Sequence, residues 1–207
     1  SIKKNRLAHA YLFTGEAGVG KKEMTLLLAK TLFCKHLNKL EPCQRCRDCR
    51  RIDSNNHPGV HLISSDSRSI KIEQIRDLKK DHSYRGIESN RKVYIIEEAE
   101  RFTKEAANSF LKVLEEPTKE TTIVLLSVQV QQLLPTIVSR CQRVAFRPLP
   151  KRTLYEKLTS ELVPHSRARL IALLTDDVDT AKIWSKDEWC AQTQNIVIQL
   201  AEELLER

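Results

Sequence analysis

A glycine-rich stretch near the start of the chain has the spacing of a phosphate-binding loop. Gly15, Gly18 and Gly20 precede Lys21 in the order G-x4-G-K, and Lys22 stands at the next position. Glycines let the backbone curl so that its N–H groups point at phosphate oxygens, and a helix that begins near Lys21 adds its positive dipole end. Lys21 can reach the outer phosphates as a point charge. The alternative is a glycine turn without a ligand, which the strand, loop and helix context disfavours.

Lys22 is a departure from this motif. The position normally carries a Ser or Thr whose hydroxyl ligates Mg²⁺. A protonated lysine cannot ligate a metal, and its charge would repel the ion at a separation of about 4 Å. We therefore expect that phosphate binding can survive, that ATP binding is weak or absent, and that metal-assisted hydrolysis is severely impaired.

Two carboxylates follow an apolar run that reads as a strand, Val93–Ile96. They are Glu97 and Glu98, and they stand where nucleotide-hydrolysing proteins hold a metal and activate water. The metal-holding residue is usually Asp, so Glu97, which is one methylene longer, is a second departure. An acidic strand end with no catalytic role remains the alternative.

Four cysteines crowd into a short segment. Cys34, Cys43, Cys46 and Cys49 have the spacing C-x8-C-x2-C-x2-C. Thiolates at this spacing can converge on one tetrahedral ion, and four of them leave no open position, so the pattern predicts a structural Zn²⁺. Unliganded cysteines or a redox pair are the alternatives, and His36 and His57 are substitute ligands. We interpret Cys141 and Cys190 as ordinary buried cysteines.

The elements around these motifs alternate between strand and helix, which predicts βαβ units and a parallel sheet. The expected strands are Ala10–Phe13, Val60–Ser64, Lys92–Ile96, Thr122–Ser127 and Arg143–Phe146. The helices expected between them are Lys21–Lys35, Ile70–Lys80 and Thr103–Glu115. After Pro148 no strand-like run appears, and the expected helices are Arg152–Leu162, Ser166–Thr175, Asp179–Trp184 and Asp187–Glu206.

The composition fits a chain that can bury a core. Of its 207 residues 41% are hydrophobic and 30% charged, and no run of about 20 apolar residues is present to span a membrane. Lys and Arg outnumber Asp and Glu by 35 to 27, a formal net charge of +8. A basic surface favours an acidic partner such as nucleic acid, although a solvated basic surface without a partner is equally compatible with charge alone.

Several segments together resemble the AAA+ subunits of the bacterial DNA polymerase III clamp loader, above all those of the delta-prime type. The likeness covers residues 6 to 148. The segments that carry it are Leu7–Phe13, the four cysteines, His57-Pro58, Ile70–Ile72, Ala106–Pro117, Leu134–Ile137 and Ser139–Cys141.

The resemblance implies an α/β fold of the AAA+ P-loop NTPase type. Residues 1–147 would form a parallel sheet with flanking helices and a zinc module at 34–49. Residues 148–207 would form a small all-helical lid, and the C-terminal collar domain of the family is expected to be absent from this chain. A replication protein of this kind is expected in the bacterial cytoplasm, at replication forks in the nucleoid.

The resemblance also implies partners and a role for one arginine. The expected partners are the gamma/tau motor subunits, the delta subunit, the sliding clamp and primed DNA, with no membrane. Arg140 would be presented to the nucleotide of a neighbouring subunit, where such an arginine raises hydrolysis by about 10³–10⁵ in related enzymes. Motor subunits carry Thr at the loop and Asp-Glu at the strand end, whereas this chain has Lys22 and Glu97-Glu98, and Thr180 aligns with the nucleotide-sensing arginine of the lid.

These departures favour a non-hydrolysing stator subunit over a motor. One alternative is an active ATPase of the gamma/tau type, or a nucleotide kinase, which turnover of MgATP by the isolated chain would reveal. Another is a zinc-dependent module whose arginines, such as Arg45 and Arg47, contact DNA directly. Loss of DNA binding on removing those arginines, with the fold intact, would favour that hypothesis.

Overall fold

The computed structural model describes residues 7–65, 69–83, 91–116 and 120–187, with five single positions after residue 191; for residues 79–83 it describes the backbone alone. The chain divides into two compact units. We call Ser1–Gly15 with Lys21–Phe146 the sheet unit, and Glu16–Gly20 with Arg147–Arg207 the helical unit. Each unit is described by itself.

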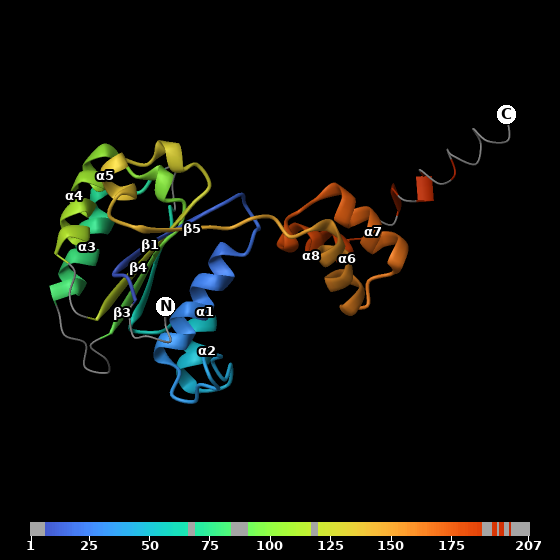
Figure 1. Ribbon diagram of the computed structural model, residues 1–207, viewed down its shortest axis with the longest axis horizontal. Coiled ribbons are helices and arrows are strands. Elements are labelled where there is room, and N and C mark those ends of the chain that lie inside the picture. The colour runs from blue at the N-terminus through green and yellow to red at the C-terminus, as the bar shows by residue number, and fades with distance from the viewer. Residues whose placement is uncertain are drawn as a thin grey trace. The chain divides into compact units, whose positions relative to one another are not determined.

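Five parallel strands form one sheet in the order β2-β3-β4-β1-β5 (Figure 1). They are β1 Ala10–Thr14, β2 Val60–Ile63, β3 Lys92–Ile96, β4 Thr121–Ser127 and β5 Gln142–Ala145. The central strands β3 and β4 are buried along their whole length, as their continuous apolar runs predict for strands covered on both faces.

Helices cover both faces of the sheet. They are α1 Lys21–Phe33, α2 Arg47–Asp53, α3 Ile72–Ser83, α4 Lys104–Glu115 and α5 Pro135–Val138. Helices α1 and α2 lie on one face, and α3, α4 and α5 lie on the other (Figure 1). Two cores result: Phe110 of α4 packs with Leu12 and Tyr94 in one, while Ala29 of α1 packs with Phe13 and Val124 in the other.

Helix α4 shows why these segments become helices here. Its apolar residues recur at helical spacing, so that Ala106, Phe110 and Val113 are all buried against the sheet. Thr103 caps its first turn, because the hydroxyl accepts a hydrogen bond from the N–H of Ala106 at 3.1 Å. The cap and the buried face together fix the position of α4, including its last residue, Glu115.

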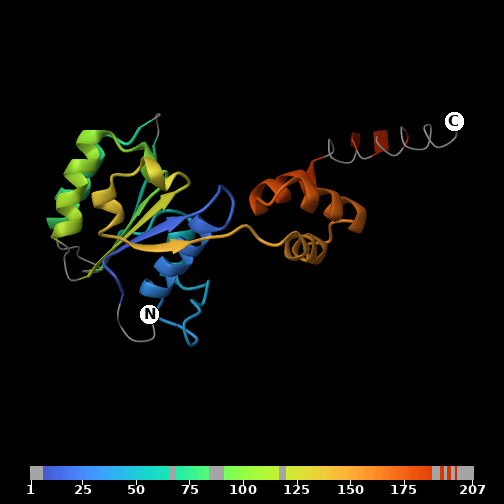
Figure 2. The ribbon, with the colours of Figure 1, turned by 45° about the horizontal axis from the view of Figure 1, so that its top comes forward.

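The helical unit contains α6 Lys151–Ser160, α7 His165–Leu174 and α8 Val178–Lys186, which Figure 2 shows as a group of short helices. A small core of its own joins them, in which Leu154, Ile171 and Ala181 are fully buried. Asp177 caps α8 by accepting hydrogen bonds from the N–H groups of Asp179 and Thr180.

The sequence-based prediction of an α/β parallel sheet with flanking helices is confirmed, and the predicted strands agree with the observed ones to within one residue at each end. Helix α2 was not predicted, since a seven-residue helix in a cysteine-rich segment has too few apolar positions to show a period. The predicted helix Asp187–Glu206 lies almost entirely outside the described residues, as does Cys190. Over the part of the chain that is described, no helix has the length and apolarity needed to cross a bilayer.

Candidate functional site

The phosphate-type loop connects the carboxyl end of β1 to the first turn of α1. Gly18 and Gly20 have φ of +69° and +85°, a left-handed backbone that favours glycine over residues with a side chain. Gly15, the first residue of the motif, is held at the end of the sheet because its N–H donates to the carbonyl oxygen of Ser127 at 3.3 Å. The Lys21 ammonium donates to the Gly15 carbonyl at 2.7 Å, so it lies against the first residue of the motif.

Lys21 is buried and carries an ammonium group close to carboxylates. Burial lowers its pKa, because a charge is less well solvated in the interior, while the nearby Glu100 and then Glu23 act in the opposite direction. The loop thus presents a partly desolvated cation at the start of a helix, which suits an anion.

Lys22 makes an ion pair with the first carboxylate after β3. Its Nζ lies 2.8 Å from Oε1 of Glu97, and the two side chains are 46% and 20% exposed. The sequence placed these residues at the two positions that hold a metal in nucleotide-hydrolysing sites, and the structure brings them into direct contact. The Lys22 ammonium is therefore paired with the carboxylate that a magnesium ion would need as a ligand.

Glu98, the second carboxylate, is also engaged. Its backbone is left-handed, with φ of +49° and ψ of +50°, immediately before the short 3-10 helix η2 Ala99–Arg101. Its Oε2 lies 2.9 Å from the Arg101 guanidinium and accepts a hydrogen bond from Ser65 at 3.0 Å. The Glu98 carboxylate is therefore held by Arg101 and Ser65, which follow β3 and β2.

Two further polar groups at this edge were missed by sequence reasoning. Glu100 accepts a hydrogen bond from the N–H of Val128 through Oε1, while its buried Oε2 has no hydrogen-bond partner among the described residues. The hydroxyl of Ser127, the last residue of β4, is likewise buried without a partner in that part of the chain. The carboxyl ends of parallel strands lie at one edge of the sheet. Polar residues at or just after the end of each strand could therefore have predicted these two groups.

Arg140 lies just after α5, at the opposite end of that helix from Pro135. Its Nη2 is 2.8 Å from Oε1 of Glu115, the last residue of α4, and its Nη1 donates to the carbonyl oxygen of Thr136 at 3.0 Å. The Arg140 side chain is 38% exposed. These contacts do not include Lys22 or Glu97, so the described structure does not bring Arg140 to the loop of its own chain.

The four cysteines meet beside the end of α1. Cys34 follows that helix, and Cys46 caps α2 by accepting a hydrogen bond from the N–H of Cys49. The sulfur atoms of all four cysteines lie within 4.8 Å of one another, and those of Cys34 and Cys46 are 4.0 Å apart. In the segment 35–45 between them, Lys39 and Gln44 have left-handed backbone, with φ of +58° and +59°.

This cluster could hold a metal ion. Thiolates bound to one tetrahedral zinc ion at about 2.3 Å stand about 3.8 Å apart, close to the observed separation. His57, one of the substitute ligands, is engaged elsewhere: its Nδ1 accepts the N–H of Gly59 at 3.1 Å, and its Nε2 lies 3.6 Å from Asp48. The donor set that the geometry offers is therefore the four sulfurs.

The thiols of the cluster differ in their electrostatic environment. The N–H of Arg45 donates to the sulfur of Cys43 and lowers its pKa to about 6. Burial raises the pKa of Cys49 to about 12. Cys141, which was interpreted as buried, is only partly buried and packs against the core on the α4 side of the sheet, and this partial burial raises its pKa to about 11.

Comparison with known proteins places these features in context. A family model described as "DNA polymerase III, delta subunit" matches residues 1–150. The DNA polymerase III subunit delta' of Bacillus subtilis is 46% identical over all 207 residues, which is 63% of that relative's length. The tau/gamma subunit of Haemophilus influenzae is 35% identical over 83% of this chain and 25% of its own length.

Solved structures give the same picture at the level of the fold. A DNA polymerase III gamma subunit-related protein from Thermotoga maritima has a TM-score of 0.55 at 28% identity, over 83% of this chain and 54% of that one. A mutant of the Thermotoga maritima RuvB protein has a TM-score of 0.59 at 15% identity, over 89% of this chain and 56% of its own, a likeness in fold alone.

Proposed function

Because the chain belongs to the DNA polymerase III delta-subunit family, we propose that it acts as a non-motor subunit of the clamp loader. In this role it helps to load the sliding clamp onto primed DNA. Its partners in the assembly are the gamma/tau motor subunits and the delta subunit, and it works in the cytoplasm at replication forks. Zinc in the cysteine cluster braces the insertion between α1 and β2 and takes no part in chemistry.

The observation that carries this proposal is the Lys22–Glu97 ion pair of 2.8 Å. In a working site, a hydroxyl and a carboxylate at these two positions hold Mg²⁺, which neutralises charge on the transferring phosphate. Here the carboxylate is already neutralised by an ammonium group. Two unit charges at about 4 Å repel by roughly 1–4 kcal/mol, depending on solvent exposure, so a divalent cation is disfavoured beside Lys22.

The state of Glu98 supports the same conclusion. A general base must reach the attacking water and must be able to take its proton. The Glu98 carboxylate instead shares an ion pair with Arg101 and a hydrogen bond with Ser65. Both contacts hold the carboxylate in its present orientation.

Arg140 is the residue through which this subunit would assist hydrolysis. It is partly exposed at the end of α5, and Glu115 and Thr136 hold its guanidinium on the surface of its own unit. A guanidinium held in this way is available to a phosphate on a neighbouring subunit, where it would stabilise charge in the transition state.

The decisive experiment is reconstitution of the assembly with the motor subunits, the delta subunit and the clamp. We expect Arg140→Ala to lower DNA-stimulated ATP hydrolysis by at least about tenfold, which is modest beside the range for arginines supplied in trans. Arg76→Ala, at an exposed position on α3, is the matched control and should leave hydrolysis unchanged. Equal hydrolysis with Arg140→Ala and Arg76→Ala would remove the proposed role of Arg140.

A second candidate function, an active ATPase subunit of the gamma/tau type, is favoured by one observation. The loop retains left-handed Gly18 and Gly20 and a lysine, Lys21, that lies against Gly15. Turnover of MgATP by the isolated chain, measured as released phosphate, would favour this candidate. A chain that releases no phosphate above background supports the non-motor role.

A further inference from the structure

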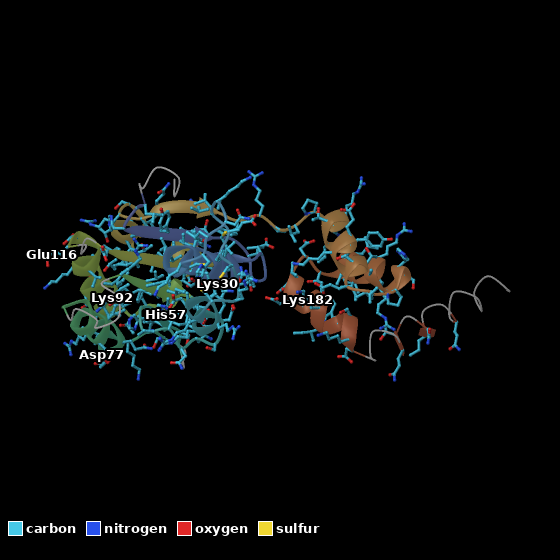
Figure 3. The ribbon with its side chains drawn as sticks, turned by 90° about the horizontal axis from the view of Figure 1, so that it is seen from below. Lys30, His57, Asp77, Lys92, Glu116 and Lys182 are labelled. Atoms are coloured by element: carbon cyan, nitrogen blue, oxygen red, sulfur yellow. The ribbon has the colours of Figure 1, made fainter. Side chains whose placement is uncertain are left out.

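A cleft lies beside the cysteine cluster, on the α1 and α2 face of the sheet unit. Its volume is about 540 Å³, within the usual range for ligand sites. The walls come from four stretches of chain: the end of α1, helix α2, the segment that leads into β2 and the residue before β3. Figure 3 labels His57, which lines this cleft, and Lys30, which lies on the same side of the unit.

Basic side chains dominate the lining. Lys35, Arg47, Arg51 and Arg91 all border the cleft, against a single carboxylate, Asp48. Nε2 of His57 lies 3.6 Å from that carboxylate. A zinc ion on four thiolates would add a net charge of about −2, so the lining would still carry an excess of positive charge.

The two arginines of α2 are mounted on a rigid support. Arg47 and Arg51 are four residues apart, so they lie on one side of the helix, separated by about 6 Å along its axis. The other side of α2 is anchored by Cys49 and Ile52, which are 0% and 1% exposed. Arg91 is positioned independently, because its Nη1 donates to the carbonyl oxygen of Leu32 at 2.7 Å.

We propose that this cleft binds the sugar–phosphate backbone of nucleic acid. Planar guanidinium groups match the geometry of phosphate oxygens and carry a permanent charge. Backbone contacts of this kind hold a strand in position without reading its sequence. The choice of nucleic acid over an acidic protein segment rests on the proposed role in DNA replication.

The test measures binding of a fluorescent 20-nucleotide oligonucleotide, single-stranded and duplex, to the full chain over a range of salt concentrations. For R47Q/R51Q we expect affinity to fall by about tenfold and the slope of log K against log salt to decrease by about two, since each lost phosphate contact removes about one unit. The matched control is K104Q/K112Q, which removes two exposed lysines from α4, on the opposite face of the sheet.

Metal content separates this role from simple charge balance around the thiolates. R47Q/R51Q should retain its zinc while losing affinity for the oligonucleotide. If that variant loses zinc, Lys35→Gln decides instead: a slope lower by about one supports the proposal, and an unchanged slope overturns it.

Three other outcomes would overturn the proposal. The first is equal loss of affinity in R47Q/R51Q and in K104Q/K112Q, which would mean that net charge alone attracts the DNA. The second is the absence of any measurable binding to either oligonucleotide. The third is binding of a polyglutamate peptide in place of DNA. None of these results bears on ATP hydrolysis by the reconstituted assembly, so the Arg140→Ala experiment still tests the proposed function separately.

Discussion

Lys22 shows how a single side chain can change the chemistry of a loop without changing its shape. The glycines keep their left-handed backbone and Lys21 still lies against Gly15, so the framework for an anion is retained. What differs is the set of ligands that a metal could use, because the Lys22 ammonium lies 2.8 Å from the Glu97 carboxylate. A partly exposed pair of this kind contributes about 1 kcal/mol or less to stability, so its effect is on binding rather than on folding.

This view predicts that two substitutions together restore metal-dependent nucleotide binding. Lys22→Thr supplies a hydroxyl, and Glu97→Asp shortens the carboxylate to the usual metal-binding length. We expect the double variant to bind MgADP at least about tenfold more tightly than the wild-type chain, with the gain abolished by a chelator of Mg²⁺. Isothermal titration calorimetry measures the affinities directly.

The controls for this prediction are the conservative exchanges. Lys22→Arg keeps the cation and should bind no better than the wild type. Glu97→Asp alone leaves the ammonium in place and should also show no gain. A wild-type chain that already binds MgADP as tightly as the double variant would contradict the assigned role of Lys22.

The cysteine cluster depends on its local elements more than on the sheet. Cys34 stands at the end of α1, while Cys46 and Cys49 belong to the start of α2, so the cluster joins two helices across the connecting segment 35–45. This segment has few apolar residues of its own, Leu37 and Leu40, with which to stay folded. We infer that a bound metal supplies the missing stability and that ligand removal would release α2 from its place.

A pair of cysteine substitutions tests this at the level of the element. Cys49→Ser removes a buried sulfur of the cluster, and we expect it to lose most of the bound zinc and to unfold at a lower temperature. Cys141→Ser removes a sulfur that lies outside the cluster and should keep about one zinc per chain. Metal analysis and thermal unfolding are the measurements, and full zinc content in Cys49→Ser would contradict the four-sulfur site.

At the scale of the whole molecule, each unit has a hydrophobic core of its own. Phe110 is fully buried among residues of the sheet unit, and Ile171 is fully buried among α6, α7 and α8. The core of the helical unit is small, and small cores leave little margin of stability. A substitution that weakens one core should therefore destabilise the unit that contains it before the other unit.

We predict that core truncations act locally. Ile171→Ala should cost about 2–5 kcal/mol and raise amide hydrogen exchange in α6, α7 and α8, while exchange in β3 and β4 stays unchanged. Phe110→Ala should cost about 3–5 kcal/mol and have the opposite pattern. Hydrogen-exchange mass spectrometry resolves these segments, and a parallel rise in both units after either substitution would show that they unfold together.

Much of the site was predictable because its signals are local in the chain. The spacing of Gly15, Gly18 and Gly20 predicts the loop, and Lys22 predicts its altered chemistry. The spacing of the four cysteines predicts the cluster. Strand β3 was predicted with its observed bounds, because a short apolar run with polar residues on either side can be recognised from the adjacent positions in the sequence. The end of that run also marked Glu97 and Glu98.

What only the tertiary structure decided are pairings between distant positions. Lys22 and Glu97 meet because the strand order β2-β3-β4-β1-β5 brings the carboxyl ends of β1 and β3 to one edge, with β4 between them. Glu115 reaches Arg140 because α4 and α5 lie on the same face of the sheet. Such contacts depend on strand order and on which face each helix covers, and a periodic pattern within one segment carries no information about either.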